Sequence, residues 1–328
     1  MGQLVDGKWE TVVIDPRKQD GKFKRADAAF RNWITRDGSP GPSGEGGFKA
    51  EPGRYHLYVS YACPWAHRTL IVRELKGLAK VIDVSVVHWF MDHNGWSFET
   101  GDGATGDSLL GKAQMHEIYT QARDDYTGRA SVPVLWDKER GTIVSNESSE
   151  IIRMLNSEFN EWGDASLDLY PQVLRAEIDA VNEGIYHNYN NGVYKCGFAT
   201  SQDAYDACFA ALFKELDGLE ARLGQSRYLV GDQMTEADWR FFPTLVRHDP
   251  VYFGHFKCNL RRIFDYPNLW NYTKELYQVP GVAETVDLHH IKHHYYASHE
   301  TVNPTRIVPV GPQIDYTTPH DRARLKAA

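Results

Sequence analysis

The sequence predicts an α/β domain followed by an all-helical domain, and three observations support this prediction. The chain has 328 residues, which at about 150 residues per domain indicates about two domains. Short β-branched runs alternate with helical runs over residues 55–156, and beyond residue 170 only helical spacing remains. Hydrophobic residues make up 42% and charged residues 24% of the chain, as in globular proteins.

The first half has the order β-α-β, an insertion, then α-β-β-α, which is typical of a mixed α/β layer. The insertion, at about residues 88–108, is rich in Gly and Asp. Strands are expected at 55–59, 81–87, 132–136 and 141–145, and helices at 69–75, 109–122 and 146–156.

The second half carries apolar residues at helical spacing, for example Phe209, Leu212, Leu216 and Leu219. Helices are expected at 173–190, 202–223 and 235–246, with a linker at 161–168. We therefore divide the chain into an N-terminal extension (1–50), an α/β domain (51–160), an all-helical domain (169–300) and a C-terminal tail (301–328).

The extension contains a segment too rich in Gly and Pro for a helix or a strand, at residues 37–47. Its aromatic residues favour a loop docked on a neighbouring surface, and simple disorder is the alternative. In the tail, the basic residues Arg322, Arg324 and Lys326 are expected to form a solvated end.

Composition and charge exclude several classes of function. The net charge of -8 argues against nucleic acid as the main partner, because phosphate binding requires a basic surface. The sequence contains no run of eighteen apolar residues, so it predicts no membrane span. The N-terminus lacks the pattern of a signal peptide. We therefore expect a cytoplasmic protein whose four cysteines are reduced thiols.

Cys63 is the candidate nucleophile because it directly follows a predicted strand and opens a predicted helix. Pro64 suits the first helical position. A cysteine at this place faces the positive end of the helix dipole, which favours the thiolate and lowers the pKa of the thiol. A buried, inert cysteine is the alternative. Cys196, Cys208 and Cys258 show no such feature, and for them the inert interpretation is preferred.

Ala66 lies three residues after Cys63, at the position where redox-active dithiol proteins carry a second cysteine. A lone thiolate cannot resolve its own mixed disulfide, so an external thiol must do so. Glutathione is the obvious small thiol.

Two later segments provide contacts for a γ-Glu-Cys-Gly tripeptide. A cis Val132–Pro133 bond at the start of a strand would leave the Val132 backbone able to pair with an extended peptide; an edge-strand proline is the alternative. The helix beginning near residue 146 would hold the γ-glutamyl carboxylate, with Ser148 donating and Glu147 accepting from the ligand's amino group. An ordinary capping cluster is the alternative for these residues.

At these residues the sequence resembles the thioredoxin-fold glutathione transferases, and more narrowly the glutathionyl-hydroquinone reductases, or Xi class. The resemblance covers nearly the whole chain, and the ordered set of motifs is specific. The motifs are GKF at 21–23, CPWAHR at 63–68, NGW at 94–96, SNES at 145–148, NNGVYK at 190–195, DPVY at 249–252, HY at 294–295 and NP at 303–304.

The resemblance implies the glutathione transferase fold, with a thioredoxin-like N-terminal domain and an all-α C-terminal domain. It also implies a homodimer that reduces S-glutathionyl-hydroquinones with glutathione and releases oxidised glutathione. Cys63 matches the family's nucleophile, and Tyr194, Tyr252 and Tyr295 match tyrosines around its aromatic substrate pocket. The matches to its glutathione site are Trp96, Arg129, Ala130, Ser131, Val132, Glu147 and Ser148.

The sequence around Tyr194 and Tyr252 predicts turns marked by Asn, Gly or Pro, from which both rings would project into a cleft. Core packing is the alternative and is favoured for each tyrosine taken alone, but the resemblance reverses that preference. A phenol can lower the pKa of a thiolate by donating to it, or can protonate a leaving group. We therefore expect Cys63 to attack the glutathione sulfur of the conjugate while a tyrosine, Tyr194 first among them, protonates the departing aromatic carbon.

Other functions stay open at this point. Dehydroascorbate reduction and removal of glutathione from proteins use the same thiol, and a non-catalytic interaction module would use the same fold. Conjugation of glutathione to electrophiles is least favoured, because Cys63 would form a disulfide. A histidine run, His289, His290, His293, His294 and His299, invites a metal interpretation, but no neighbouring ligand set completes it, and we expect no metal.

Overall fold

The computed structural model describes residues 2–11 and 20–325. The described chain forms two compact units, each of which we describe by itself. Among the described residues, unit 1 comprises 2–11, 26–167 and 285–294, and unit 2 comprises 20–25, 168–284 and 295–325. The parts of the extension at 1 and 12–19 and of the tail at 326–328, Lys326 included, lie outside the described residues.

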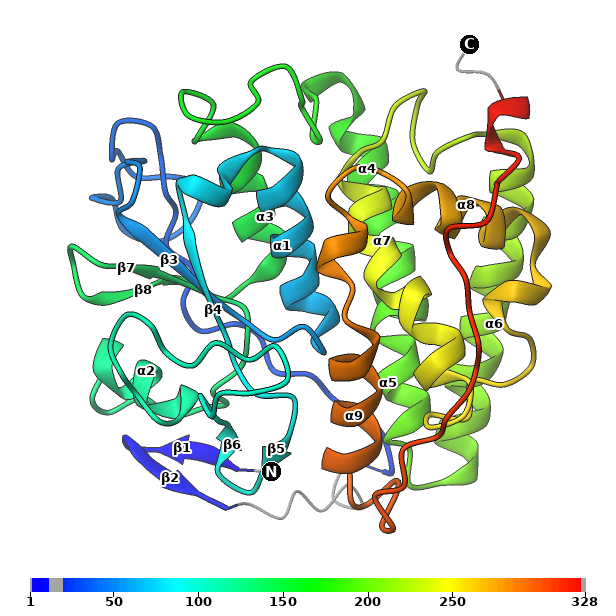
Figure 1. Ribbon diagram of the computed structural model, residues 1–328, viewed down its shortest axis with the longest axis horizontal. Coiled ribbons are helices and arrows are strands. Elements are labelled where there is room, and N and C mark those ends of the chain that lie inside the picture. Colours follow the sequence, from blue (N-terminus) through cyan, green and yellow to red (C-terminus); the bar gives the residue numbers. More distant parts are fainter. Residues whose placement is uncertain (1, 12–19, 326–328) are drawn as a thin grey trace. The chain divides into compact units, whose positions relative to one another are not determined.

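Unit 1 is built on a mixed four-stranded sheet with the order β4-β3-β7-β8 (Figure 1). β3 pairs in parallel with β4 and antiparallel with β7, which pairs antiparallel with β8. The strands are β3 (Tyr55–Val59), β4 (Asp83–Val86), β7 (Val134–Asp137) and β8 (Thr142–Ser145). All five residues of β3 and all four of β7 are buried, as expected for the inner strands of a covered sheet.

Three helices cover this sheet, with α1 and α3 packed together on one side and α2 on the other (Figure 1). They are α1 (Pro64–Leu75), α2 (Met115–Ala122) and α3 (Ser148–Ser157). The predicted order of elements is therefore confirmed. Two short antiparallel pairs complete the unit, β1 (Gln3–Val5) with β2 (Lys8–Glu10) and β5 (Met91–Asp92) with β6 (Gly95–Trp96).

The helix predicted from residue 109 begins only at Met115. Asp107 accepts hydrogen bonds from the backbone N–H groups of Leu109, Leu110 and Lys112, and so holds that segment in a turn. A capping box between Gln114 and Glu117 then starts the helix.

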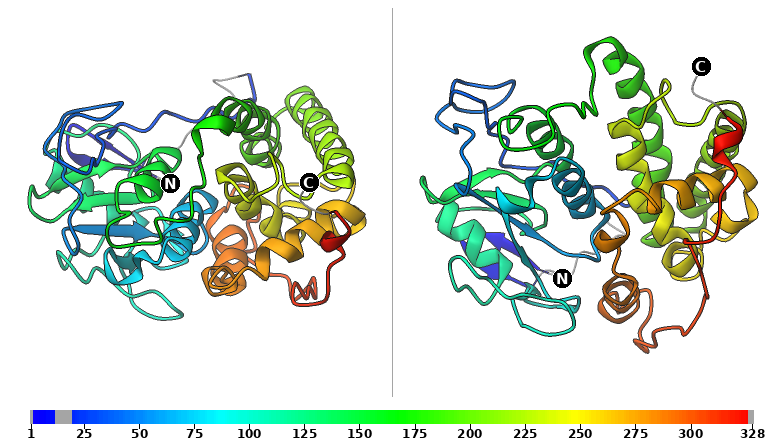
Figure 2. Two further views of the ribbon diagram at one scale, coloured as in Figure 1. Left: turned by 90° about the horizontal axis from the view of Figure 1, so that it is seen from above. Right: turned by 45° about the horizontal axis from the view of Figure 1, so that its top comes forward.

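Unit 2 is helical, as predicted, and its long helix α6 packs against α5 and α8 (Figure 2). Its α-helices are α4 (Arg175–Ile185), α5 (Gly192–Gly197), α6 (Gln202–Gln225), α7 (Glu236–Arg247) and α8 (Pro267–Tyr277). Two π-helical turns follow α4 and α7, at Tyr186–Asn190 and His248–Tyr252. Helix α9 (Leu288–Ser298) begins in unit 1, and its residues from Tyr295 belong to unit 2.

The tail corrects one prediction. Arg322 is not solvated: its exposed fraction is 0%. Its guanidinium donates to the carbonyl oxygens of Leu223, Ser226 and Arg227, at the C-terminal end of α6. Those carbonyls have no partner within the helix, so the arginine stabilises the helix end while it anchors the tail.

Candidate active site

Cys63 is the N-cap residue of α1, and Pro64 occupies the first helical position, as predicted. The residue is half-buried, and its backbone is extended (φ -78°, ψ 120°) before the helix begins. Its Sγ atom accepts no capping hydrogen bond and instead lies 3.4 Å from the carbonyl oxygen of Val132, to which the thiol donates. The sulfur therefore stands between the start of α1 and the residue that precedes Pro133.

The Val132–Pro133 peptide bond is cis, which confirms the prediction. The backbone just before it is held by Tyr119, a fully buried residue of α2. The hydroxyl of Tyr119 donates to the carbonyl oxygen of Ser131 at 2.8 Å and accepts from Asn146 Nδ2 at 3.1 Å. The segment that leads into β7 is thereby tied to the segment that leads into α3.

Of the segment from Arg129 to Val132, Arg129 is exposed, Ala130 and Ser131 are half-buried and Val132 is buried. The remaining predicted glutathione contact, Trp96, ends β6 and is 8% exposed. The ring of Trp96 stacks on His294, with 4.5 Å between the ring centroids.

Glu147 is the N-cap of α3, and its Oε1 atom accepts from the backbone N–H of Ser149 at 2.9 Å and from its hydroxyl at 2.7 Å. The capping role considered as the alternative is therefore real. Ser148 is the first helical residue and is buried, with its Oγ 3.4 Å from Arg68 Nη1. The helix start thus combines backbone N–H groups with a buried cation, a combination that suits an anion.

Arg68 belongs to the CPWAHR motif, but the sequence predicted no role for it at the glutathione site. It lies on α1, is 2% exposed, and its guanidinium carbon lies 4.5 Å from the centroid of the Trp65 ring. Because α1 and α3 pack together, the guanidinium reaches Ser148 across eighty residues of sequence. The signal that could have found it is a charged residue directly before an apolar helical run.

The three predicted tyrosines lie together in unit 2. The hydroxyl oxygens of Tyr194 and Tyr295 are 2.5 Å apart, and those of Tyr252 and Tyr295 are 3.0 Å apart. Tyr252 and Tyr295 are fully buried, and burial raises the pKa of each well above its usual value, with neighbouring tyrosines adding to the increase. Tyr194 is half-buried, so it is the least buried member of the cluster.

The predicted turns at Tyr194 and Tyr252 are wrong, because both residues are helical. Tyr194 lies in α5, and Tyr252 ends the π-helical turn after α7. The Asn and Pro residues that suggested turns mark instead the places where α-helices pass through π-helical geometry, which has a different period.

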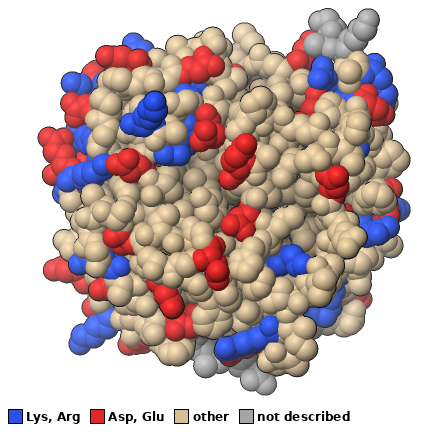
Figure 3. Space-filling view, in the orientation of Figure 1, with Lys and Arg blue, Asp and Glu red and all other residues tan. Residues whose placement is uncertain are grey.

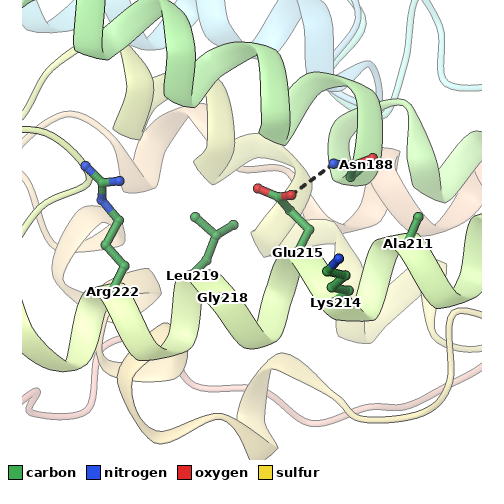
Figure 4. Close-up of a pocket in the computed structure, with 7 residues that line it drawn as sticks. All are labelled: Asn188, Ala211, Lys214, Glu215, Gly218, Leu219 and Arg222. Carbon is green, nitrogen blue, oxygen red and sulfur yellow. Dashed lines mark hydrogen bonds between the residues drawn. The ribbon is translucent and has the colours of Figure 1, made fainter.

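A cavity of about 580 Å³ lies elsewhere in unit 2, between α6 and the π-helical turn that follows α4, and includes none of the predicted site residues. Glu215 there accepts a hydrogen bond from Asn188 at 3.0 Å (Figure 4). Lys214 and Arg222 also line it, and Arg222 pairs with Glu177 at 2.6 Å. Its chemistry has no thiol, hydroxyl pair or aromatic ring, so we do not assign the reaction to it.

Three further observations concern long apolar helices, metal ligands and surface charge. No helix within residues 2–11 and 20–325 has the length and apolar character to cross a membrane. His289 and His293 stack at 3.8 Å, but among the side chains that the structure describes no group of three or more His, Cys, Asp or Glu residues is placed to hold a metal ion. On the face drawn in Figure 3, acidic side chains lie among the basic ones, with no broad basic area among the coloured atoms.

Comparison with known proteins agrees with this geometry. The glutathione S-transferase N-terminal domain family matches residues 62–158, and the glutathione S-transferase C-terminal domain family matches residues 202–275. The fold is thus that of a glutathione S-transferase.

Relatives that match over the full length of the chain identify its class within the glutathione S-transferases. The chain is 55% identical to the glutathionyl-hydroquinone reductase YqjG of Escherichia coli over 98% of both chains, and 51% identical to the glutathionyl-hydroquinone reductase PcpF of Sphingobium chlorophenolicum over 95% and 96%. The glutathione-bound structure of YqjG superposes with a TM-score of 0.91 at 53% identity, covering 98% of this chain and 99% of that one. A Xi class glutathione transferase from Natrialba magadii gives a TM-score of 0.91 at 46% identity, covering 99% and 98%. The chain belongs to the Xi class of glutathione S-transferases, the family of the glutathionyl-hydroquinone reductases.

Proposed function

We propose that this protein reduces S-glutathionyl-hydroquinones with glutathione, releasing the free hydroquinone and oxidised glutathione. One observation carries the proposal: a lone, half-buried cysteine caps α1 in a chain that matches glutathionyl-hydroquinone reductases over its full length. Ala66 takes the place of a second cysteine, so the intermediate must be resolved by an external thiol.

The glutathione moiety binds along unit 1. Its cysteinyl backbone pairs with Val132, its γ-glutamyl carboxylate lies at the start of α3 near Ser148, and its amino group donates to Glu147. The buried Arg68 guanidinium beside Ser148 supports this orientation, because a buried cation favours the bound carboxylate. Trp96 and the segment from Arg129 to Ser131 complete the site.

In the first step, the Cys63 thiolate attacks the sulfur of the conjugate. The bond between that sulfur and the aromatic carbon breaks, its electron pair goes to the carbon, and a proton joins the carbon to give the hydroquinone. Tyr194 supplies the proton; the Tyr295 hydroxyl holds that of Tyr194 in place, and Tyr252 in turn contacts Tyr295. The enzyme is left with a disulfide between Cys63 and glutathione.

In the second step, the thiolate of a second glutathione attacks the glutathione sulfur of this disulfide. Oxidised glutathione leaves, and Cys63 returns to the thiolate. Over the cycle, two glutathionyl sulfurs are joined and the aromatic carbon exchanges sulfur for hydrogen, so electrons and protons balance.

We further propose that the protein works as a homodimer in the cytoplasm and requires no metal. The oligomeric state can be measured by light scattering on the purified protein, where a mass near that of one 37.4 kDa chain would contradict the dimer.

The proposal is tested by steady-state rates with a defined S-glutathionyl-hydroquinone, with dehydroascorbate and with a glutathionylated protein. We expect the first substrate to have the highest kcat/KM, and Cys63→Ala to lose at least about a thousandfold. A higher kcat/KM for either of the other substrates would assign a different reductase activity. Full activity in Cys63→Ala would rule out the mechanism.

A further inference from the structure

The three cysteines that the mechanism does not use lie in unit 2, and two of them are in contact. Cys196 lies on α5 and Cys208 on α6, and these helices pack against each other. The sulfur atoms of Cys208 and Cys196 are 3.1 Å apart. Cys258, which follows the second π-helical turn, is buried and adjoins Cys196.

Of these three cysteines, only Cys208 is partly exposed to solvent. Cys208 is half-buried, while Cys196 is 3% exposed and Cys258 is completely buried. A soluble oxidant therefore meets Cys208 first. The two sulfurs must approach by only about 1 Å to reach the length of a disulfide bond.

We propose that Cys196 and Cys208 form a reversible disulfide with oxidised glutathione as the oxidant. The Cys208 thiolate attacks oxidised glutathione, forms a mixed disulfide and releases one glutathione. The Cys196 thiolate then attacks the Cys208 sulfur and releases the second glutathione. Two protein thiols are oxidised by two electrons, and one oxidised glutathione is reduced to two glutathione molecules.

The oxidant is a product of the proposed reductase reaction, and in this respect the inference rests on that function. The disulfide would also act close to the reaction, because Cys196 is two residues from Tyr194 on α5. Accumulating product would thus modify the helix that carries the proposed proton donor.

The contact between Cys196 and Cys208 also affects the pKa of both thiols, and therefore how fast they are oxidised. The hydrogen bond to Cys196, followed by burial, raises the pKa of Cys208. The pKa of Cys196 is lowered by the Cys208 contact, but the Cys258 contact and burial outweigh this and raise it. Both groups are therefore thiols at neutral pH, and oxidation should accelerate as the pH increases from 7 to 9.

The test uses Cys63→Ser protein, so that only these three cysteines remain and the reductase reaction plays no part. The protein is incubated with oxidised glutathione at pH 8.5, and its intact mass is measured. It is then denatured, alkylated and analysed by peptide mass spectrometry. We expect the intact mass to fall by two hydrogen atoms, only Cys258 to be alkylated, and a linked peptide to join Cys196 to Cys208. Dithiothreitol added before denaturation should restore the mass, remove the linked peptide and leave all three cysteines alkylated.

Two matched variants complete the experiment. Cys258→Ser should still form the disulfide, whereas Cys208→Ser should lose it. Alkylation of all three cysteines after incubation, a glutathione that stays attached to Cys208, or a link from Cys196 to Cys258 would each overturn the proposal. None of these results depends on whether hydroquinone conjugates are the substrates.

Discussion

At the scale of single residues, the proposed anion site at the start of α3 includes a residue far away in the sequence. Ser148 stands at the first helical position, where backbone N–H groups are without helical partners, and Arg68 adds a buried positive charge. From the SNES motif at residues 145–148, only the position of Ser148 could be predicted. The contribution of Arg68 depends on the packing of α1 against α3.

Ser148→Ala should raise the KM for glutathione about tenfold, because one hydrogen bond to a charged group is lost. The value of kcat with saturating glutathione should stay within about twofold of wild type. Initial rates over a range of glutathione concentrations measure both constants. Ser157→Ala, an exposed position at the other end of α3, is the control, and an unchanged KM in Ser148→Ala would remove this residue from the site.

Tyr194 has a cationic neighbour of its own in the extension. The Arg25 guanidinium carbon lies 4.8 Å from the centroid of the Tyr194 ring, and Arg25 Nε donates to Asn191 at 3.0 Å. Phe23 stacks on the same ring at 6.2 Å. Residues 20–25 therefore dock on the proposed proton donor, which fits the docked-loop interpretation for this part of the extension.

Arg25→Gln should lower kcat/KM for a glutathionyl-hydroquinone about tenfold, because the cation no longer orients the Tyr194 ring. Reduction of a small glutathione mixed disulfide should be unaffected, because that reaction needs no proton on carbon. Rates with the two substrates, and with Lys22→Gln as an exposed control, measure the difference. Equal losses with both substrates would contradict a role at Tyr194.

At the scale of elements, the sequence predicts best where the signal is local. The strand, cysteine and proline at β3 and α1 appear as expected, and so do β7, β8 and α3, because alternation and capping residues act over a few positions. The start of α2, the helical state of Tyr194 and the burial of Arg322 were missed. The first two depend on local geometry that residue types alone do not specify, namely the turn closed by the Asp107 carboxylate and the π-helical register. The third depends on carbonyl oxygens about a hundred residues away, at the end of α6.

Helix α7 provides a prediction on stability at this scale. Thr235 is fully buried at its N-cap, accepts from the Ala237 N–H, and forms a capping box with Asp238. Thr235→Ala should lower the free energy of unfolding by about 1–2 kcal/mol, measured by urea denaturation. Ser201→Ala removes the exposed N-cap of α6 and should cost less; an equal cost for both variants would contradict the importance of burial at α7.

At the scale of the whole molecule, the fold keeps several histidines neutral. Burial lowers the pKa of His56, His248 and His255 from 6.5 to about 4. Burial raises the pKa of Asp249 from 3.8 to about 6, so that acidification favours the folded state at this residue. On acidification the unfolded chain takes up protons at the histidines before the folded chain does, and Asp249 offsets only part of this difference.

The free energy of unfolding should therefore be highest above pH 6.5 and should fall as the pH decreases from about 6.5 to about 4. Thermal unfolding midpoints at pH 7.5, 6 and 5 measure this dependence. His56→Asn should show a smaller loss between pH 7.5 and 5, whereas His187→Asn, an exposed position, should behave as wild type. A midpoint that rises on acidification would contradict the assignment of neutral, buried histidines.

The covalent intermediate provides the most direct test of the whole account. A stoichiometric amount of S-glutathionyl-hydroquinone is mixed with reduced enzyme in the absence of free glutathione, and the products are measured by chromatography and intact mass. We expect one equivalent of free hydroquinone per active site and one glutathione bound by a disulfide to Cys63, released as oxidised glutathione when glutathione is added. Turnover without this adduct, or an adduct on another cysteine, would contradict it.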